Sequence, residues 1–353
     1  MNGFASPADP SRTVAVIGLG SMGFGMAQSL LRAGIRVIGC DVSPTSMERF
    51  VAEGGGAAAT PAEAARNADV VACVVVNAAQ TEAVLFNPAG VAEPMAEGTV
   101  FVSSATMDPD VARGLGRRLE ATGRLYLDAP ISGGAARASL GHLTILASES
   151  EAAFAKARPA LDAMAARIYE LGNEPGAGAA FKMINQLLAG VHIAAACEAI
   201  AFAAKQGLDL AKVYEVITAS AGNSWMFENR VPHVLAGDYR PLSYVEIFMK
   251  DLGIIQDMAR AARSPAPSRL PHSRCTWPQP EPAWVETMIP PSPARMRHSP
   301  EPSCRRRRSF ERSWISRHRF NTTALRSREI HSMDQALTDW SPSSSSPDIE
   351  NII

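Results

Sequence analysis

One stretch, residues 13–41, constrains the fold of this chain more than any other. Its sequence is TVAVIGLGSMGFGMAQSLLRAGIRVIGCD. A short apolar run over 14–17 predicts a buried strand, a helical pattern then stops at Gly34, and a second apolar run over 35–40 leads to Asp41. The first strand and the helix are joined by three glycines in the spacing G-x-G-x-x-G, namely Gly18, Gly20 and Gly23. This order of strand, helix, strand and acid predicts a βαβ unit that binds a dinucleotide.

The glycine loop predicts how the dinucleotide would be held. Gly18 permits a tight turn, Gly20 has no Cβ and lets the pyrophosphate approach the backbone, and Gly23 lets helix and strand pack closely. The free N–H groups and the dipole at the helix N-terminus favour an anion. The predicted cofactor loop therefore consists of Gly18, Leu19, Gly20, Ser21, Met22 and Gly23.

Asp41 indicates which dinucleotide is expected. Its carboxylate can accept hydrogen bonds from the two hydroxyls of the adenosine ribose and would repel a 2′-phosphate, so NAD is favoured over NADP. The alternative is a purely local role, in which Asp41 serves the turn before Ser43 and Pro44.

Strands and helices continue to alternate after this unit. Apolar runs over 70–76, 100–103 and 125–128 predict buried parallel strands. Asn77 directly follows the first of them, at the carboxyl end where such sheets bind ligands. The alternation predicts an α/β domain of the Rossmann type, with a doubly wound parallel sheet, over residues 13–175.

A long Ala-rich helix is predicted over 176–206, GAGAAFKMINQLLAGVHIAAACEAIAFAAKQ, and its nearly unbroken apolar surface predicts that it is buried. Further helices to residue 263 predict an all-α second domain over 176–263. Lys182 stands out on this helix, and Asn185 and Gln186 extend its polar face. A buried lysine is costly unless it is paired or used, and burial lowers its pKa towards the range that suits proton transfer. The alternative is a lysine whose ammonium reaches solvent near the helix end.

Two other motifs carry polar groups. Ser132, Gly133 and Gly134 form a sharp turn after a strand, and the N–H groups of such a turn can cradle an anion, although a plain glycine loop is the alternative. Lys250 and Asp251 lie in the helical stretch FMKDLGIIQDM, where charges of an exposed helix face are the alternative to a site.

Four motifs in this order resemble the 3-hydroxyisobutyrate dehydrogenase family of β-hydroxyacid dehydrogenases: VIGLGSMGFGMAQSL, DAPISGGAARASLGHLTIL, GAGAAFKMINQLL and FMKDLG. The resemblance covers about residues 13–263. It implies an NAD(P)-binding Rossmann domain, a long connecting helix and a helical domain through which such enzymes form homo-oligomers. It also implies that hydride passes from the substrate carbinol carbon to the nicotinamide while Lys182 handles the hydroxyl proton.

The resemblance assigns roles to the other motif residues. Asn185 and Gln186 would orient the lysine and the substrate hydroxyls. Ser132, Gly133 and Gly134 would hold the substrate carboxylate, and Thr106 and Lys250 would border the nicotinamide end of the cofactor.

Three further stretches are similar to the branch of the family that acts on L-threonate: VVNAAQTEAVLF, QLLAGVHIAAACEA and AGNSWMFENR. The expected reaction is the NAD-dependent oxidation of L-threonate to its 2-oxo acid. Gln186 stands where many members have Asn, which argues against a simple 3-hydroxyisobutyrate substrate. The alternatives are 3-hydroxyisobutyrate, tartronate semialdehyde or an inactive product, whereas imine reductases of this fold generally lack a lysine where this chain has Lys182.

The totals of the whole chain exclude other classes of function. The net charge is −1, so neither a nucleic acid nor a membrane is expected as a partner. The five cysteines are odd in number and show no metal-ligand spacing, which predicts reduced thiols in a cytoplasmic protein without a metal site. We expect neither a signal peptide nor a transmembrane helix.

The composition changes abruptly at Ser264. The stretch 264–353 has no Gly and no Lys but holds 13 of the 25 prolines and four of the five tryptophans. A shifted reading frame accounts for this change. In the shifted frame, each new codon consists of the last base of one codon and the first two bases of the next. Trp277 followed by Pro278 then gives an alanine codon. In the same way, 267–294 can read VAAAALQMYLAAAGAGMGRDDDSAVA, which resembles the helix, Gly-rich turn and Asp-rich segment of the family's C-terminus.

We infer from this that a frameshift begins near residues 264–268 and predict disorder over most of 264–353. It leaves the second domain truncated and makes oligomer formation by this chain doubtful. A basic nucleic-acid-binding arm at 305–308 is the rival interpretation of the tail.

Overall fold

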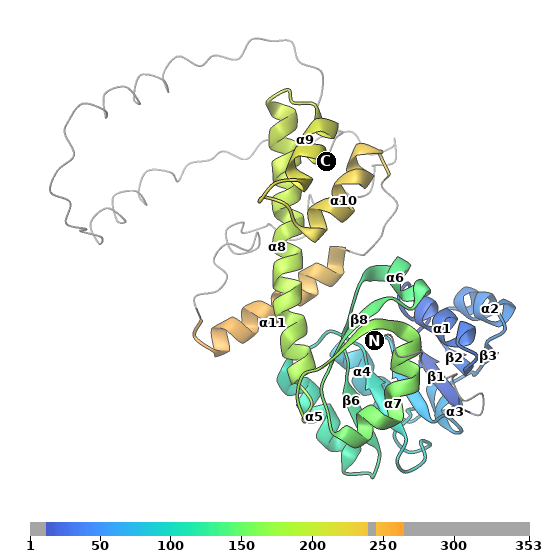
Figure 1. Ribbon diagram of the computed structural model, residues 1–353. Coiled ribbons are helices and arrows are strands. Elements are labelled where there is room, and N and C mark those ends of the chain that lie inside the picture. Colours follow the sequence, from blue (N-terminus) through green and yellow to red (C-terminus); the bar gives the residue numbers. More distant parts are fainter. Residues whose placement is uncertain (1–11, 239–244, 265–353) are drawn as a thin grey trace, which may run out of the picture. The chain divides into compact units, whose positions relative to one another are not determined.

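The computed structural model describes residues 12–238 and 245–264 (Figure 1). The predicted disorder, the frameshift and the basic arm at 305–308 lie outside the described residues. The predicted boundaries of the domains stay a prediction.

Six parallel strands form the first sheet, in the order β3-β2-β1-β4-β5-β6. This is the strand order of a Rossmann sheet, in which the chain reverses direction between β1 and β4 and leaves a crevice for a ligand. The predicted fold class is confirmed. The strands are β1 (Thr13–Ile17), β2 (Arg36–Cys40), β3 (Gly56–Ala57), β4 (Val70–Cys73), β5 (Val100–Ser103) and β6 (Leu125–Asp128).

Helices cover both faces of this sheet and bury two apolar clusters. Met26 and Leu30 of α1 and Phe154 of α7 lie in one cluster, and Leu85 of α4 and Leu119 of α5 lie in the other. The sheet can therefore carry continuous apolar strands, because neither face meets water. The helices of this domain are α1 (Gly23–Arg32), α2 (Pro44–Ala52), α3 (Pro61–Ala65), α4 (Ala78–Phe86), α5 (Pro109–Glu120), α6 (Gly134–Leu140) and α7 (Glu151–Met164).

A second sheet of three strands follows, which the sequence analysis does not predict. It consists of β7 (Ile131–Ser132), β8 (Leu143–Ala147) and β9 (Ala165–Glu170), with β7 antiparallel and β9 parallel to β8. The first of these strands has only two residues, too few for an alternating pattern to be recognised. This sheet holds the Ser132 turn next to the carboxyl end of β6.

The described residues after β9 are largely helical. They form α8 (Ala177–Lys205), α9 (Leu210–Thr218), α10 (Trp225–Leu235) and α11 (Val245–Ala261). Helices α10 and α11 both pack on α8, and Phe227 and Val231 of α10 are buried against Ile200 of α8.

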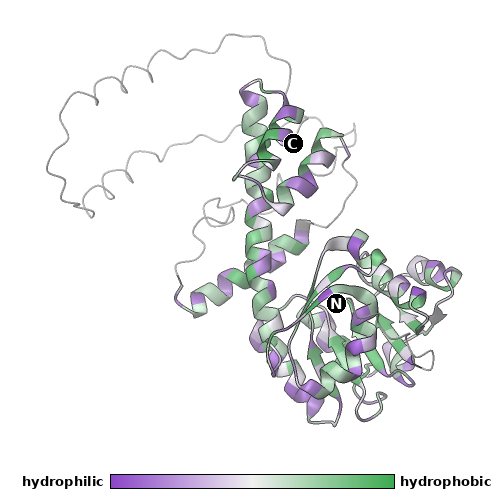
Figure 2. Ribbon diagram, in the orientation of Figure 1, coloured by the Kyte–Doolittle hydropathy of each residue, from purple (hydrophilic) through white to green (hydrophobic). Residues whose placement is uncertain are grey.

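The prediction that α8 is buried on all sides is wrong for the described residues. Figure 2 shows hydrophobic residues along the whole length of this helix. One face packs on neighbouring elements, but Phe181, Ile184 and Leu188 are 54%, 60% and 52% exposed. An apolar helix is buried only as far as partners cover it, and the described residues provide none for this stripe. By length and composition alone α8 could also cross a membrane.

Candidate functional site

The glycine loop has the close contacts that its spacing predicts. Gly18 has φ +95°, and a Cβ there would lie 2.5 Å from the carbonyl oxygen of Val74, the residue directly after the neighbouring strand β4. A Cβ on Gly23 would lie 1.9 Å from the carbonyl oxygen of Gly18. Any side chain at either position would break the turn between β1 and α1.

Gly20 differs from these two glycines, because no atom lies within 4 Å of the place where its Cβ would be. The turn itself therefore leaves room for a side chain at this position. Among the described residues, the N–H groups of Gly20, Ser21 and Met22 have no protein acceptor. Open space and free donors at the start of α1 fit the pyrophosphate of a dinucleotide.

Asp41 lies beside this loop and braces it. Its Oδ2 accepts a hydrogen bond from the N–H of Leu19 at 2.5 Å, and its Oδ1 accepts one from the N–H of Ser43 at 2.7 Å. Ser43 in turn caps α2 by accepting from the N–H of Ser46. Asp41 therefore has a local role in the turn before Ser43 and Pro44, and its contact with the ribose stays a prediction.

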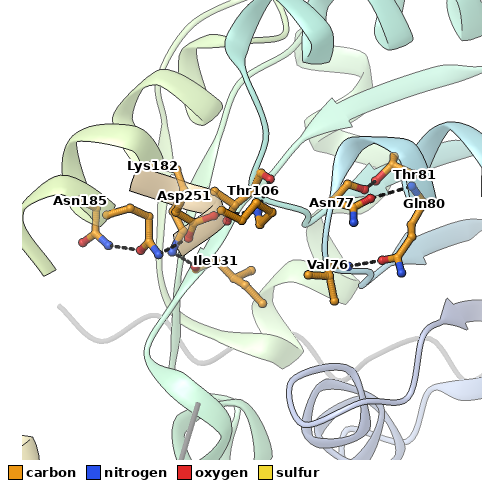
Figure 3. Close-up of polar contacts among 11 residues, drawn as sticks. Val76, Asn77, Gln80, Thr81, Thr106, Ile131, Lys182, Asn185 and Asp251 are labelled. Atoms are coloured by element: carbon orange, nitrogen blue, oxygen red, sulfur yellow. Dashed lines mark hydrogen bonds and ion pairs between the residues drawn. The ribbon is translucent and has the colours of Figure 1, made fainter. Parts of the chain in front are cut away.

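Asn77 caps a helix at the carboxyl end of β4. Its Oδ1 accepts from the N–H of Gln80 at 2.9 Å, while Gln80 accepts from the N–H of Val76 at 2.8 Å (Figure 3). This capping turn explains why the strand ends at Cys73 and not at Val76, which is 51% exposed. Its predicted contact with the cofactor stays untested.

Lys182 is buried, with only 7% of its surface exposed. Its ammonium does not reach solvent but donates a hydrogen bond to the carbonyl oxygen of Ile131 at 2.7 Å. Burial lowers the pKa of Lys182 to about 8. The negative charge of Asp251 opposes this shift, whereas the positive charge of Lys250 adds to it. A lysine with such a pKa can exchange a proton near neutral pH.

A chain of polar side chains runs from α8 to α11 beside Lys182 (Figure 3). Asn185 donates from Nδ2 to Oε1 of Gln186 at 3.0 Å, and Gln186 donates from Nε2 to Oδ2 of Asp251 at 2.5 Å. Gln186 is 6% exposed and Asp251 is fully buried. The two helices thus share a buried network that fixes the amide of Gln186.

Asp251 is a site residue to which the sequence analysis gives no role. The motif FMKDLG contains it, but it is 65 residues from Gln186 in the chain, and only the packing of α11 on α8 brings the two together. The one signal in the sequence was an acid next to Lys250 in an otherwise apolar helical turn.

Lys250 connects α11 to the loop after β5. Its Nζ donates to the carbonyl oxygen of Thr106 at 2.8 Å and forms an ion pair with Oδ1 of Asp251 at 2.7 Å. The structure therefore brings together the two residues that the resemblance assigns to the nicotinamide end.

The turn at Ser132 follows the strand residue that Lys182 contacts. Ser132 ends β7 and is partly buried, and Gly133 has φ +139°, a conformation that favours glycine. Gly134 opens α6. The turn thus lies one residue from the carbonyl that accepts from Lys182, and its contact with a substrate stays a prediction.

No cluster of metal-binding side chains occurs in the part of the chain that the structure describes. The described cysteines Cys40, Cys73 and Cys197 are free thiols.

Two family models match the chain. One is described as the NAD binding domain of 6-phosphogluconate dehydrogenase and matches residues 13–172. The other is described as the NAD-binding of NADP-dependent 3-hydroxyisobutyrate dehydrogenase and matches residues 176–270.

Known proteins agree with these models. The L-threonate dehydrogenase of Cupriavidus necator is 55% identical over 257 residues, which are 73% of this chain and 86% of that protein. That of Haemophilus influenzae is 49% identical over 72% of this chain and 84% of its own length. A crystal structure of 3-hydroxyisobutyrate dehydrogenase from Salmonella typhimurium, 49% identical, superimposes with a TM-score of 0.69 and covers 72% of this chain and 90% of that one. This chain therefore belongs to the 3-hydroxyisobutyrate dehydrogenase-like family of NAD(P)-binding hydroxyacid dehydrogenases, close to the L-threonate dehydrogenases.

Proposed function

We propose that this protein oxidises L-threonate to its 2-oxo acid with NAD as the hydride acceptor. The observation that carries the proposal is the 55% identity to an L-threonate dehydrogenase over 86% of that relative's length. The buried lysine and the buried amide network beside it support an oxidation of a hydroxyl group at this place.

The substrate itself is tested by comparing hydroxyacids. We expect kcat/KM to be highest for L-threonate, because the reach of Gln186 and the patch AGNSWMFENR match the L-threonate branch. The comparison should include 3-hydroxyisobutyrate and, in the direction of reduction, tartronate semialdehyde. A higher kcat/KM for 3-hydroxyisobutyrate, or reduction of tartronate semialdehyde by a protein that does not oxidise L-threonate, would transfer the assignment to that substrate and leave the family unchanged.

The residues around the glycine loop would hold the cofactor. The N–H groups of Gly20, Ser21 and Met22 would bind the pyrophosphate, and Asp41 would accept hydrogen bonds from the adenosine ribose. Thr106 and Lys250 would border the nicotinamide. When bound, the nicotinamide supplies the acceptor for the hydride from the substrate carbinol carbon.

Replacing Asp41 by asparagine should change the preference between the two dinucleotides. The charge that repels a 2′-phosphate is removed, so the ratio of kcat/KM with NAD to kcat/KM with NADP should fall about tenfold, a difference of about 1.4 kcal/mol. Initial rates with both cofactors measure this ratio. A lower melting temperature with an unchanged ratio would mean that Asp41 only braces the turn through Leu19 and Ser43.

Lys182 would take the hydroxyl proton of the substrate. Neutral lysine can accept this proton and ammonium cannot, so the reaction needs the deprotonated form. The carbonyl oxygen of Ile131 fixes the position of Nζ at 2.7 Å, and the turn at Ser132–Gly134 would hold the substrate carboxylate next to it. Asn185 and Gln186 would orient the lysine and the substrate hydroxyls.

The pH dependence should reveal the two charges that flank the lysine. For oxidation, kcat/KM should fall as the pH drops through about 8, where Lys182 becomes protonated. Asp251 raises the pKa of Lys182 and Lys250 lowers it, so Asp251→Asn should move this limb to lower pH and Lys250→Met should move it to higher pH. A limb that stays in place in both variants would remove Lys182 from the proton transfer.

The tail and the assembly of the chain stay predictions. We propose that residues after about 264 derive from a shifted reading frame, which the nucleotide sequence would show directly. An undisturbed frame shared with close relatives would end this proposal. Formation of a homo-oligomer by an intact family member, and the cytoplasmic location, also stay predictions.

A further inference from the structure

The most buried carboxylate outside the site described above is that of Asp128, which is 1% exposed at the end of β6. Its Oδ2 accepts hydrogen bonds from the N–H groups of Gly176 at 2.9 Å and Ala179 at 2.8 Å. Both donors belong to the start of α8, whose own N-cap residue, Gly176, has no side chain to accept them. Asp128 therefore caps α8 from a different element of the fold.

Ser148 completes this cap. Its hydroxyl accepts from the N–H of Gly178 at 2.9 Å and lies 3.5 Å from Oδ2 of Asp128, to which it donates. A Cβ on Gly178 would lie 2.3 Å from the carbonyl oxygen of Leu146, so the helix start is also pressed against the strand. Two side chains thus bind three N–H groups in the first turn of α8.

The same short segment contacts α8 a second time. Asp128 holds the helix start, and three residues later the carbonyl oxygen of Ile131 accepts from Nζ of Lys182. Lys182 lies one helical turn beyond Gly178, about 6 Å along the axis. A shift of α8 by one residue would turn it by about 100° and carry the lysine away from this carbonyl.

We propose that Asp128, together with Ser148, is a positioning residue for the reaction: it fixes the first turn of α8 and thereby holds Lys182 at the Ile131 carbonyl, beside the turn at Ser132. This rests on the proposed function in so far as Lys182 is the base. Loss of the cap would let water reach the lysine, and the ammonium form would regain hydration. The pKa of Lys182 would then rise towards the value of an ordinary, hydrated lysine.

The charged and titratable groups around both ends of this arrangement are known. Asp251 and Lys250 act on Lys182, while Arg113, Glu149 and Tyr126 lie near Asp128. Burial raises the pKa of Asp128 to about 6, although the hydrogen bonds from the N–H groups of Ala179 and Gly176 lower it. Asp128 is therefore ionised at the pH where Lys182 titrates, so the two groups can be followed separately.

The test uses the full chain without cofactor or substrate. The chain has five lysines, so NMR of protein labelled with ¹³C at the lysine ε-carbon gives few signals, and the one missing in Lys182→Arg belongs to Lys182. In the unchanged protein this signal should titrate near pH 8. In Asp128→Ala its pKa should rise by about one unit or more, towards the ordinary value for lysine.

Three other variants make the result specific. Asp128→Asn keeps an oxygen acceptor and should show a smaller rise, and Ser148→Ala should also show a smaller rise. Glu149→Gln alters a neighbouring buried carboxyl group whose Oε1 accepts from the N–H of Ser150, outside the hydrogen bonds of the cap, and should leave the titration of Lys182 unchanged. If Asp128→Ala does not fold, Asp128→Asn and Ser148→Ala decide the matter in the same way.

Folded Asp128 and Ser148 variants with an unchanged Lys182 titration would overturn the proposal. Kinetics provide a second measurement: kcat should fall about tenfold in Asp128→Ala while the KM for the dinucleotide stays the same, since the hydrogen bonds of the cap join β6, Ser148 and α8 and not the glycine loop. If the unchanged protein does not oxidise L-threonate, the substrate assignment fails, yet the NMR titration still decides whether Asp128 positions the lysine.

Discussion

Replacing Lys182 by methionine should lower kcat for hydroxyacid oxidation by about 10³-fold, within the range usual for the loss of a general base. Methionine has a similar length and suits a buried position, so the melting temperature should change little. Binding of the dinucleotide should also be unchanged, because the glycine loop lies on another element. Steady-state rates measure kcat, and a titration followed by the fluorescence of the reduced nicotinamide measures binding of the dinucleotide.

Two further variants are the controls for this experiment. Lys205→Met removes a lysine from the exposed last turn of the same helix and should leave kcat unchanged. Lys182→Arg keeps a positive charge that does not dissociate in this pH range and should be as inactive as the methionine variant. An active arginine variant would mean that the charge of Lys182, and not its proton, matters for the reaction.

Substitutions in the glycine loop should separate binding of the cofactor from folding. Gly20→Val should weaken dinucleotide binding by about tenfold or more, about 1.4 kcal/mol, since the side chain would fill the space left for the pyrophosphate. It should leave the melting temperature almost unchanged, because no atom lies within 4 Å of that Cβ. Gly23→Ala should weaken dinucleotide binding and also lower the melting temperature, because its Cβ would meet the carbonyl oxygen of Gly18. Overpacking of this kind costs about 1–3 kcal/mol of stability.

A matched control for the loop lies on another helix. Gly114 in α5 also has open space around its Cβ position, so Gly114→Ala should leave binding unchanged and should not destabilise the protein, since alanine in a helix interior is about 0.5–1 kcal/mol more favourable than glycine. Fluorescence titration with the reduced dinucleotide and thermal unfolding are the two measurements. Unchanged binding in Gly20→Val would show that the pyrophosphate does not approach the backbone at this position.

The parts of the molecule that could be predicted from sequence are those that depend on near neighbours. The strand, glycine loop and helix over 13–41 form a unit whose spacing alone determines the turn, and β5 and β6 have the bounds that their apolar runs predict. Lys182 could be singled out because it interrupts an apolar helix, and the structure does bury it.

The parts that could not be predicted depend on contacts between distant residues. Asp251 meets Gln186 across 65 residues, and the cap of α8 by Asp128 spans 48 and 51 residues. The exposed stripe of α8 was predicted to be buried, because composition indicates that a helix is apolar but not which of its faces is covered. The sheet β7-β8-β9 was missed because one of its strands is only two residues long.

The central claim is tested most directly by measuring reduced nicotinamide formed from NAD with L-threonate. The assay should use the chain as written and a version in which the reading frame after residue 263 is restored. We predict L-threonate-dependent formation of NADH by both chains, at a higher rate by the restored chain, because we propose that the second domain of the chain as written is truncated. Equal rates for the two chains would contradict the proposed truncation of the second domain. Formation of NADH by neither, with another hydroxyacid serving as substrate, would contradict the assignment to L-threonate.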